Sequence, residues 1–266
     1  MDAFAKKQVA QLRFRTSLRE RILMGAVSIA AISIFVWPLF VSAAGADEAS
    51  LAQTIFTLLM PCLLIVLALE FSNGALNSRS VAVLGVLTAV NAVVRMLGAG
   101  TAGIETVFFL VIIAGYVFGS GFGFLLGAAS LFASALLIGG FGPWLPFQMM
   151  AAGLIGIGAG MLPRFRLTRL VLIGYAIIAS FVYGALMTLW NWPFIAGAGT
   201  SVSYAPGAGL MANLERFIAY ELVTGGLLWD AGRALTTCVL IALTAPALIT
   251  TLNRAATRAG FGKGAD

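Results

Sequence analysis

Asp230 and Arg233 are the residues that most need a chemical explanation, because they stand where a long apolar run begins. The stretch "GLLWDAGRA" (226–234) opens a segment that is apolar almost without interruption to Leu252. Ionisable side chains inside a bilayer are costly unless they are paired or wetted, so they mark candidate ligand sites. Spaced i, i+3 on a helix, the two residues can pair with each other. Either they form a structural pair that holds this helix against a neighbour, or they line a water-filled pocket.

A second polar set lies on an earlier apolar run. Asn91 and Arg95 are spaced i, i+4 with Thr88 on the same face, and Glu105 is expected to begin a short helix just after the loop "GAGTAGI" (98–104). Arg95 can pair with Glu105, or each can hold one end of a zwitterionic ligand. The sequence does not separate these two interpretations.

Further amide and aromatic side chains are expected at the same level of the membrane. A concave site with aromatic walls and few polar groups is the usual design for a small organic ligand. Trp229 is as well suited to an interfacial aromatic belt as to stacking on a ligand. The remaining candidate binding residues are Trp144, Gln148, Tyr183, Asn191 and Trp229.

Residues for catalysis, metals or cofactors are not apparent. There is no histidine, and Cys62 and Cys238 have no paired spacing and lie in apolar runs. The turn "GSGFG" lacks the Lys-Ser/Thr of a phosphate-binding loop. No acidic cluster suits Mg²⁺, and no serine has a plausible base. We therefore expect no catalytic residue, no metal and no cofactor, and an enzyme has little support.

The composition requires that these residues be carried by membrane helices. Of 266 residues, 61% are hydrophobic and 10% are charged, and the mean hydropathy is +1.01, which predicts an all-α polytopic bundle in a lipid bilayer. The basic segment 1–21 reads as a retained cytosolic tail rather than a signal peptide. The basic residues behind the net charge of +6 lie in short tracts beside apolar runs. Membrane topology therefore explains them better than nucleic-acid binding does.

About eight transmembrane helices are expected from the apolar runs. A spanning helix takes about 17 to 25 residues. Segment 105–138 is too long for one crossing and is broken by "FGSGFG" (118–123) into a short and a longer helix. The other spans are 22–42, 54–71, 80–97, 147–162, 170–190 and 229–252.

An even number of spans puts the basic clusters on one side. With eight, the N-terminal tail, the connection "PRFRLTR" (163–169) and the C-terminal tail share a side, which is cytoplasmic by the positive-inside rule. We expect a multi-pass cell-membrane protein with both termini in the cytoplasm. The external loops 98–104, 139–146 and 191–226 are lids over a site or plain interfacial loops, and 213–223 can form a surface helix.

Small residues at four-residue spacing indicate close helix contacts. Gly85 and Ala89 form such a pair away from the Asn91 and Arg95 face, and Gly123/Gly127 and Gly156/Gly160 repeat the spacing. Internal packing is the ordinary explanation, and docking on a partner is the other. The pair Ala26/Ala30 is a rival for the docking role.

From about residue 79 to 252 the chain resembles the substrate-binding S component of an energy-coupling factor (ECF) vitamin transporter, particularly the actinobacterial type. The resemblance is carried by the order of short and long helices, the glycine break, and the stretches "SVAVLGVLTAVNAVVRMLGAG", "GGFGPWLPFQMMAAGLIGIGAGMLP" and "LLWDAGRALTTCVLIALTAPAL". It implies an S-component-like six-helix domain at 78–253. The extra helix pair at 22–72 is a departure from the family, and basic tails are expected at 1–21 and 254–266.

The resemblance also implies partners and a transport mechanism. An S component captures a vitamin or vitamin precursor outside, docks on a coupling transmembrane protein (T component) carried by two ATPase subunits, and tips over to release its ligand. The family docks through an Ala-x-x-x-Ala pair on the first domain helix, which here aligns with Gly85 and Ala89. The substitution of glycine for the first alanine is a departure from that pattern.

Two other function classes fit parts of the sequence. A stand-alone secondary transporter or channel for a small polar solute would use similar polar groups, but it usually shows related halves or discontinuous helices. A lipid-processing membrane enzyme is disfavoured by the missing histidine and acidic cluster. The S-component interpretation accounts for the outer charges, the loops and the absence of a nucleotide site together.

Overall fold

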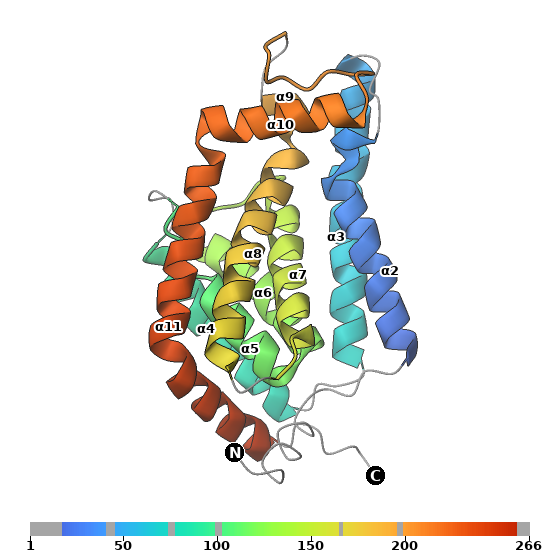
Figure 1. The fold of residues 1–266 in the computed structure, drawn as a ribbon. Coiled ribbons are helices and arrows are strands. Elements are labelled where there is room, and N and C mark those ends of the chain that lie inside the picture. The colour runs from blue at the N-terminus through green and yellow to red at the C-terminus, as the bar shows by residue number, and fades with distance from the viewer. Residues whose placement is uncertain are drawn as a thin grey trace.

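A computed structural model describes residues 18–40, 46–73, 78–98, 103–164, 167–195 and 199–259. Most of the predicted N-terminal tail and the last seven residues of the C-terminal tail lie outside these ranges. All regular elements in the described part are helical (Figure 1). They are α2 (Leu18–Phe35), the 3₁₀ turn η1 (Trp37–Leu39), α3 (Ala46–Asn73), α4 (Ser78–Met96), α5 (Phe108–Phe118), α6 (Ser120–Ile138), α7 (Leu145–Met161), α8 (Thr168–Leu189), α9 (Trp192–Ile195), α10 (Leu210–Thr224) and α11 (Gly226–Ala259).

The expected polytopic bundle is confirmed by the lengths and compositions of the helices. Four helices, α4, α6, α8 and α11, are long and apolar enough to cross a membrane. Four shorter apolar segments accompany them, at Ile22–Phe35, Thr54–Leu69, Phe108–Phe118 and Leu145–Met161. These eight segments correspond to the eight predicted spans.

The short helix α5 forms the centre of the bundle. All 11 of its residues are buried, which explains why its sequence is apolar on every side. The break from α6 falls at Gly119, whose backbone has φ 102° and ψ 175°. This conformation favours glycine, since a Cβ is poorly tolerated at positive φ. The predicted break within 118–123 is therefore confirmed.

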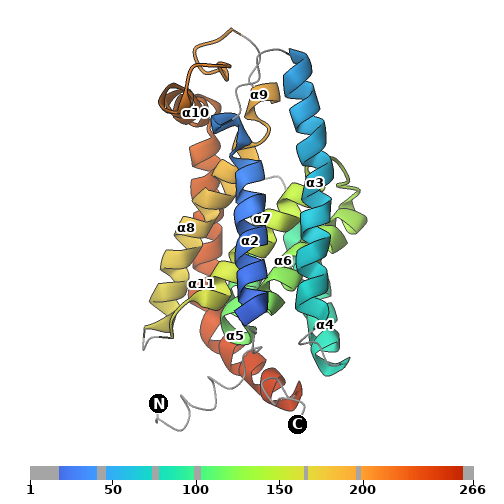
Figure 2. The same cartoon turned by 90° about the vertical axis from the view of Figure 1, so that its right-hand side faces the viewer.

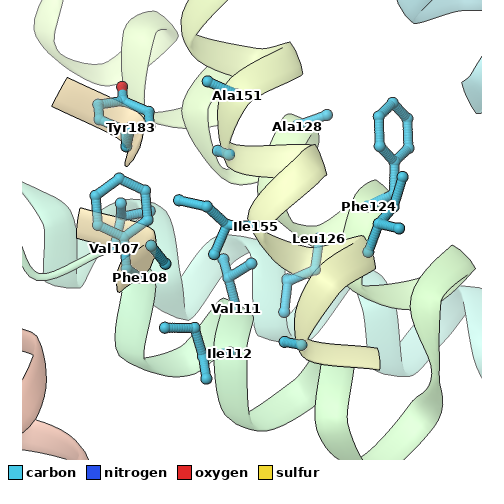
Figure 3. Close-up of a cluster of buried hydrophobic side chains, with 14 of the residues drawn as sticks. Val107, Phe108, Val111, Ile112, Phe124, Leu126, Ala128, Ala151, Ile155 and Tyr183 are labelled. Carbon is cyan, nitrogen blue, oxygen red and sulfur yellow. The ribbon is translucent and has the colours of Figure 1, made fainter. Parts of the chain in front are cut away.

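Glycines let α6 and α7 approach each other at backbone distance. A Cβ added to Gly156 would overlap the carbonyl of Gly123, and a Cβ on Gly127 would overlap that of Ala152. Larger apolar side chains, including Phe124, fill the neighbouring space (Figure 3). The small-residue pairs on these two helices therefore serve internal packing.

The first two long helices pack on the helices that follow them in the chain. Helices α2 and α3 lie side by side and contact α6, α7 and α8 (Figures 1 and 2). At η1, the indole Nε1 of Trp37 donates to the carbonyl of Trp190 at 3.0 Å. Trp190 stacks on Phe147 with centroids 3.9 Å apart, and Phe35 meets Phe147 edge-on at 5.5 Å.

Helix α10 lies across the end of the bundle rather than along it (Figures 1 and 2). Gly209 and Gly225 bound it with φ of 82° and 79°, which permits the two sharp turns. Asn213, Phe217 and Glu221 face inward and are buried. The helix is longer than the predicted surface helix at 213–223 and begins three residues earlier.

Candidate ligand-binding site

Asp230 and Arg233 form a buried ion pair in the first turns of α11. They are 4% and 7% exposed, and an Arg233 Nη1 donates to the Asp230 carboxylate. The same nitrogen donates to the carbonyl of Ser180 at 3.2 Å, and the guanidinium carbon lies 5.0 Å from the Tyr183 ring centroid. The carboxylate occupies the space where a Cβ on Gly184 would stand. The pairing left open by the sequence is therefore present.

Arg95 and Glu105 form a second pair, with Nε and Oε1 3.6 Å apart. Arg95 also donates to the Ser134 hydroxyl at 2.7 Å. Glu105 lies in the 103–107 connection and precedes α5, so the expectation that it begins that helix is wrong. Burial raises the pKa of Glu105, and the guanidinium groups of Arg95 and Arg233 oppose the shift.

Asn91 fixes the helix that carries Arg95. Its amide nitrogen, fully buried, donates to the carbonyl of Val107 at 3.1 Å and to the Ser130 hydroxyl at 3.0 Å. The first bond ties α4 to the residue before α5, and the second ties α4 to α6. Together they hold the short connection bearing Glu105 against the bundle, so Asn91 positions the neighbouring ion pair.

The two ion pairs lie around one aromatic residue. The Tyr183 ring is buried beside Phe108, with centroids 4.7 Å apart (Figure 3). Glu105 interacts electrostatically with Arg233 as well as with Arg95. The backbone of Gly103 packs so closely on the carbonyl of Trp229 that a side chain would not fit there. This contact brings the Glu105 connection against the start of α11.

Glu221 of α10 is a member of this cluster that the sequence analysis did not select. It is 4% exposed and interacts electrostatically with Asp230 and Arg233. Burial raises its pKa, and a hydrogen bond with Thr188 opposes that shift. A signal was available, because Asn213, Phe217 and Glu221 are spaced by four residues and define one face of a helix.

Several polar atoms of the cluster lack a hydrogen-bond partner among the described residues. Burying such an atom without a partner costs about 1 to 3 kcal/mol, so a concentration of them needs an explanation. Binding sites are one place where such atoms gather. The atoms are Asn91 Oδ1, Ser180 Oγ, Glu221 Oε1 and Arg233 Nε, together with Arg95 Nε and Glu105 Oε1, which face each other in the 3.6 Å ion pair.

Comparison of the sequence with models of known families identifies the family of the chain. Residues 79–255 match the model of the family described as ECF transporter, substrate-specific component. The chain belongs to this family. The match begins at the second residue of α4 and ends in α11, so it covers both ion pairs and α10. No curated protein and no solved structure matches the chain significantly.

Membership establishes several general properties. A substrate-specific component is the S component of an ECF importer, a transport protein and not an enzyme, and the chain is a multi-pass membrane protein. Within the described ranges there is no cluster of three or more metal-ligating side chains.

Four predicted site residues of this S component lie near helix ends. Trp144 and Trp229 are 47% and 46% exposed, which suits an interfacial belt. Gln148 and Asn191 are half-buried, and their backbone amides donate to the carbonyls of Trp144 and Thr188. Within the described part of the chain, none of the cluster's hydrogen bonds or ion pairs involves these four side chains. Their binding role stays a prediction.

The two residues expected to dock on a partner lie on an outer face of the S component. Gly85 and Ala89 are exposed on α4, and a Cβ added at Gly85 would meet nothing within 4 Å. By contrast, Gly123 and Gly156 lie in the contact between α6 and α7. Ala26 of α2 is also exposed, so the rival pair at Ala26/Ala30 stays open.

Proposed function

We propose that this S component captures a vitamin or vitamin precursor on the extracytoplasmic side of the cell membrane. It would then deliver the ligand by docking on a coupling transmembrane protein driven by two ATPase subunits. The observation that carries the proposal is the buried cluster of two arginines, three carboxylates and a tyrosine beneath α10. Such a density of charge inside an apolar bundle is costly and marks a functional site in membrane proteins.

The ligand class follows from the groups in the cluster. Arg95 and Arg233 supply fixed positive charge with planar donors suited to a carboxylate or phosphate. Glu105 and Asp230 supply acceptors for a cationic or amine group, and Tyr183 supplies an aromatic face. A small planar, polar or zwitterionic molecule would exchange the internal ion pairs for contacts with itself. Asn91, Trp144, Gln148, Asn191 and Trp229 complete the proposed binding set.

The proposed topology puts both termini in the cytoplasm. Arg79, Arg164, Arg169, Arg254 and Arg258 lie in helices or connections at the end opposite α10, as the positive-inside rule requires for a cytoplasmic face. In this orientation, α10 and the charge cluster beneath it lie at the extracytoplasmic end of the bundle. In the proposed division, 22–72 is an added helix pair and 78–253 is the substrate-binding domain.

Docking on the coupling protein is proposed for the α4 face at Gly85 and Ala89, in a transporter of the actinobacterial type. Small residues let a partner helix approach closely. Their exposure supports this use, since the bundle leaves the face uncovered.

Substitutions in the charge cluster test the site. Once the copurifying ligand is identified, Asp230→Asn and Arg233→Ala are expected to weaken its binding at least tenfold, the effect of losing about 1.4 kcal/mol. Both variants should still insert in the membrane, and Arg169→Gln at the opposite end serves as the matched control. Unchanged affinity in both cluster variants would return the pair to a structural role.

Reconstitution tests the transport role. In liposomes, the purified chain alone is expected to bind ligand but not to accumulate it. Accumulation should require the coupling protein, both ATPases and ATP. Uptake by the chain alone, without ATP or partners, would contradict the proposal and favour a secondary transporter.

A further inference from the structure

A cavity of about 550 Å³ opens at the end of the molecule opposite the charge cluster, between the first turns of α4 and the last turns of α11. It lies apart from the proposed vitamin site. Its lining residues are Arg79, Ala82, Val83, Thr251, Arg254, Ala255 and Arg258.

The length and bend of α11 create this cavity. The helix has 34 residues, or about 50 Å at about 1.5 Å per residue, and exceeds the roughly 30 Å of hydrocarbon it must cross. Its lower part turns beneath the bundle (Figure 1), and Pro246 inside the helix provides a cause for the bend. Leu252 and Ala256 are buried and hold this part in place.

A direct contact fixes the two helices beside the cavity. The Arg79 guanidinium donates to the backbone carbonyl of Arg258 at 3.3 Å. Arg79 therefore satisfies a carbonyl in the last turn of α11, where helix carbonyls lack intrahelical partners. This bond leaves the side chains of Arg254 and Arg258 exposed on the same side as Arg79.

The lining combines positive charge with apolar surface. Three arginines line the cavity, one from α4 and two from α11, and no carboxylate is among the lining residues. Ala82, Val83 and Ala255 supply an apolar wall. Convergent like charges repel one another unless an anion lies between them. An anionic group attached to an apolar chain matches both parts of the lining.

An apolar track leads from the cavity along the outer face of α4. Val86, Val90 and Val93 follow Ala82 at helical spacing, and they are 63%, 48% and 56% exposed. This ridge continues into the hydrocarbon depth of the bilayer, where a lipid acyl chain lies. A free phosphate ion would use the arginines but not the ridge.

We propose that this cavity binds the phosphate headgroup of an anionic phospholipid, with an acyl chain along the α4 ridge. Basic pockets between transmembrane helices at the cytoplasmic boundary are suited to such headgroups. In the proposed topology, the lipid belongs to the cytoplasmic leaflet. The site needs no vitamin and no coupling protein, so its test is independent of the proposed function.

The test uses the full chain in detergent micelles, with phosphatidylglycerol titrated and bound lipid counted by native mass spectrometry. Arg254→Gln is the informative variant, because Arg254 makes no hydrogen bond in the described part of the chain. Each arginine near an anionic headgroup contributes about fivefold to binding. We expect Arg254→Gln to weaken phosphatidylglycerol binding about fivefold, while Arg254→Lys and the control Arg169→Gln change it by less than about twofold on the same scale.

Two further arms identify the source of the phosphate group. Phosphatidylcholine, which has no net charge, is expected to bind wild type and Arg254→Gln equally and weakly. Inorganic phosphate is expected to leave bound phosphatidylglycerol in place. Displacement by inorganic phosphate, or equal phosphatidylglycerol binding by Arg254→Gln and Arg169→Gln, would overturn the proposal. So would Arg254→Gln losing the coupling protein in micelles without anionic lipid, since the cavity would then be a protein contact.

Discussion

The two ends of the helix bundle differ in how their charged side chains are stabilised. Beneath α10, Asp230 and Arg233 are at most 7% exposed and are bound to each other. At the other end, Arg254 and Arg258 are exposed beside an open cavity. Burial removes hydration, so a charged side chain beneath α10 is stabilised by its ion-pair partner. The exposed arginines at the other end are stabilised by water and lipid headgroups. The same residue types therefore form a buried charge cluster at one end and an exposed basic surface at the other.

The largest difference between the ends is expected for removal of one charge. Asp230→Ala leaves Arg233 buried without its carboxylate, which is expected to lower the free energy of unfolding by about 3 to 5 kcal/mol. Arg254→Ala should change it by less than about 0.5 kcal/mol, as for other exposed positions. Unfolding curves in detergent micelles measure both. Equal effects at the two ends would remove the distinction between them.

Arg95→Ala is expected to have an intermediate effect. It leaves the Glu105 carboxylate and the Ser134 hydroxyl without their partner, at a cost of about 1 to 3 kcal/mol. The double variant Arg95→Ala/Glu105→Gln should recover part of this loss, because no buried charge is left unpaired. A double variant less stable than Arg95→Ala in the same unfolding assay would contradict the pairing.

Glu221→Gln tests the burial of Glu221 through the pH dependence of the melting temperature. Burial raises the pKa of Glu221 above 4.5, so the folded protein binds this proton more tightly than the unfolded chain does. The stability from this group is present below about pH 4.5 and is lost as the pH rises through the folded-state pKa. The melting temperature of Glu221→Gln should therefore match wild type near pH 4 and exceed it increasingly at higher pH, by about a few degrees.

The control for this pH series is Glu215→Gln on the exposed side of α10. It removes a carboxylate from the same helix at an exposed position. A melting-temperature difference between Glu221→Gln and wild type that stays flat with pH would show that Glu221 is hydrated, and so is not part of the buried cluster.

The smallest effect on the isolated protein is expected at Gly85. Gly85→Leu should leave the melting temperature within about 2 °C of wild type, because nothing lies within 4 Å of the added Cβ. Copurification of the coupling protein should be lost. Gly174→Leu on α8 is a matched control, since that glycine is also exposed with open space around it. Retained copurification in Gly85→Leu would exclude this docking face.

The sequence was sufficient for the helices, and for each ion pair it offered pairing as one of two open alternatives. Apolar length and the positive φ at Gly119 act locally, so the eight segments and the break between α5 and α6 are predictable. Fixed i, i+3 spacing likewise brings Asp230 to Arg233. The contact between Arg95 and Glu105 needed only a short connection, although the position of Glu105 before α5 depended on where that helix begins.

The sequence was insufficient for the place of Glu221 in the charge cluster, which depends on the position of α10. Glu221 joins the cluster because α10 crosses the end of the bundle, and that crossing depends on packing such as the edge-to-face contact of Trp192 with Phe217 at 5.5 Å. Trp144 and Trp229 are predicted binding residues, and both indoles are half-exposed in the structure. A half-exposed tryptophan at a helix end suits an interfacial belt as well as a ligand site, so their binding role stays a prediction.

Mass spectrometry of the small molecules retained through purification tests the central claim most directly, namely that the buried cluster binds the transported ligand. Wild type and Arg254→Gln are predicted to carry the same small polar compound in stoichiometric amount, and Arg233→Ala is predicted to lose it while remaining folded. If Arg233→Ala retains that compound as fully as wild type does, the ligand lies elsewhere and the account of the site is contradicted.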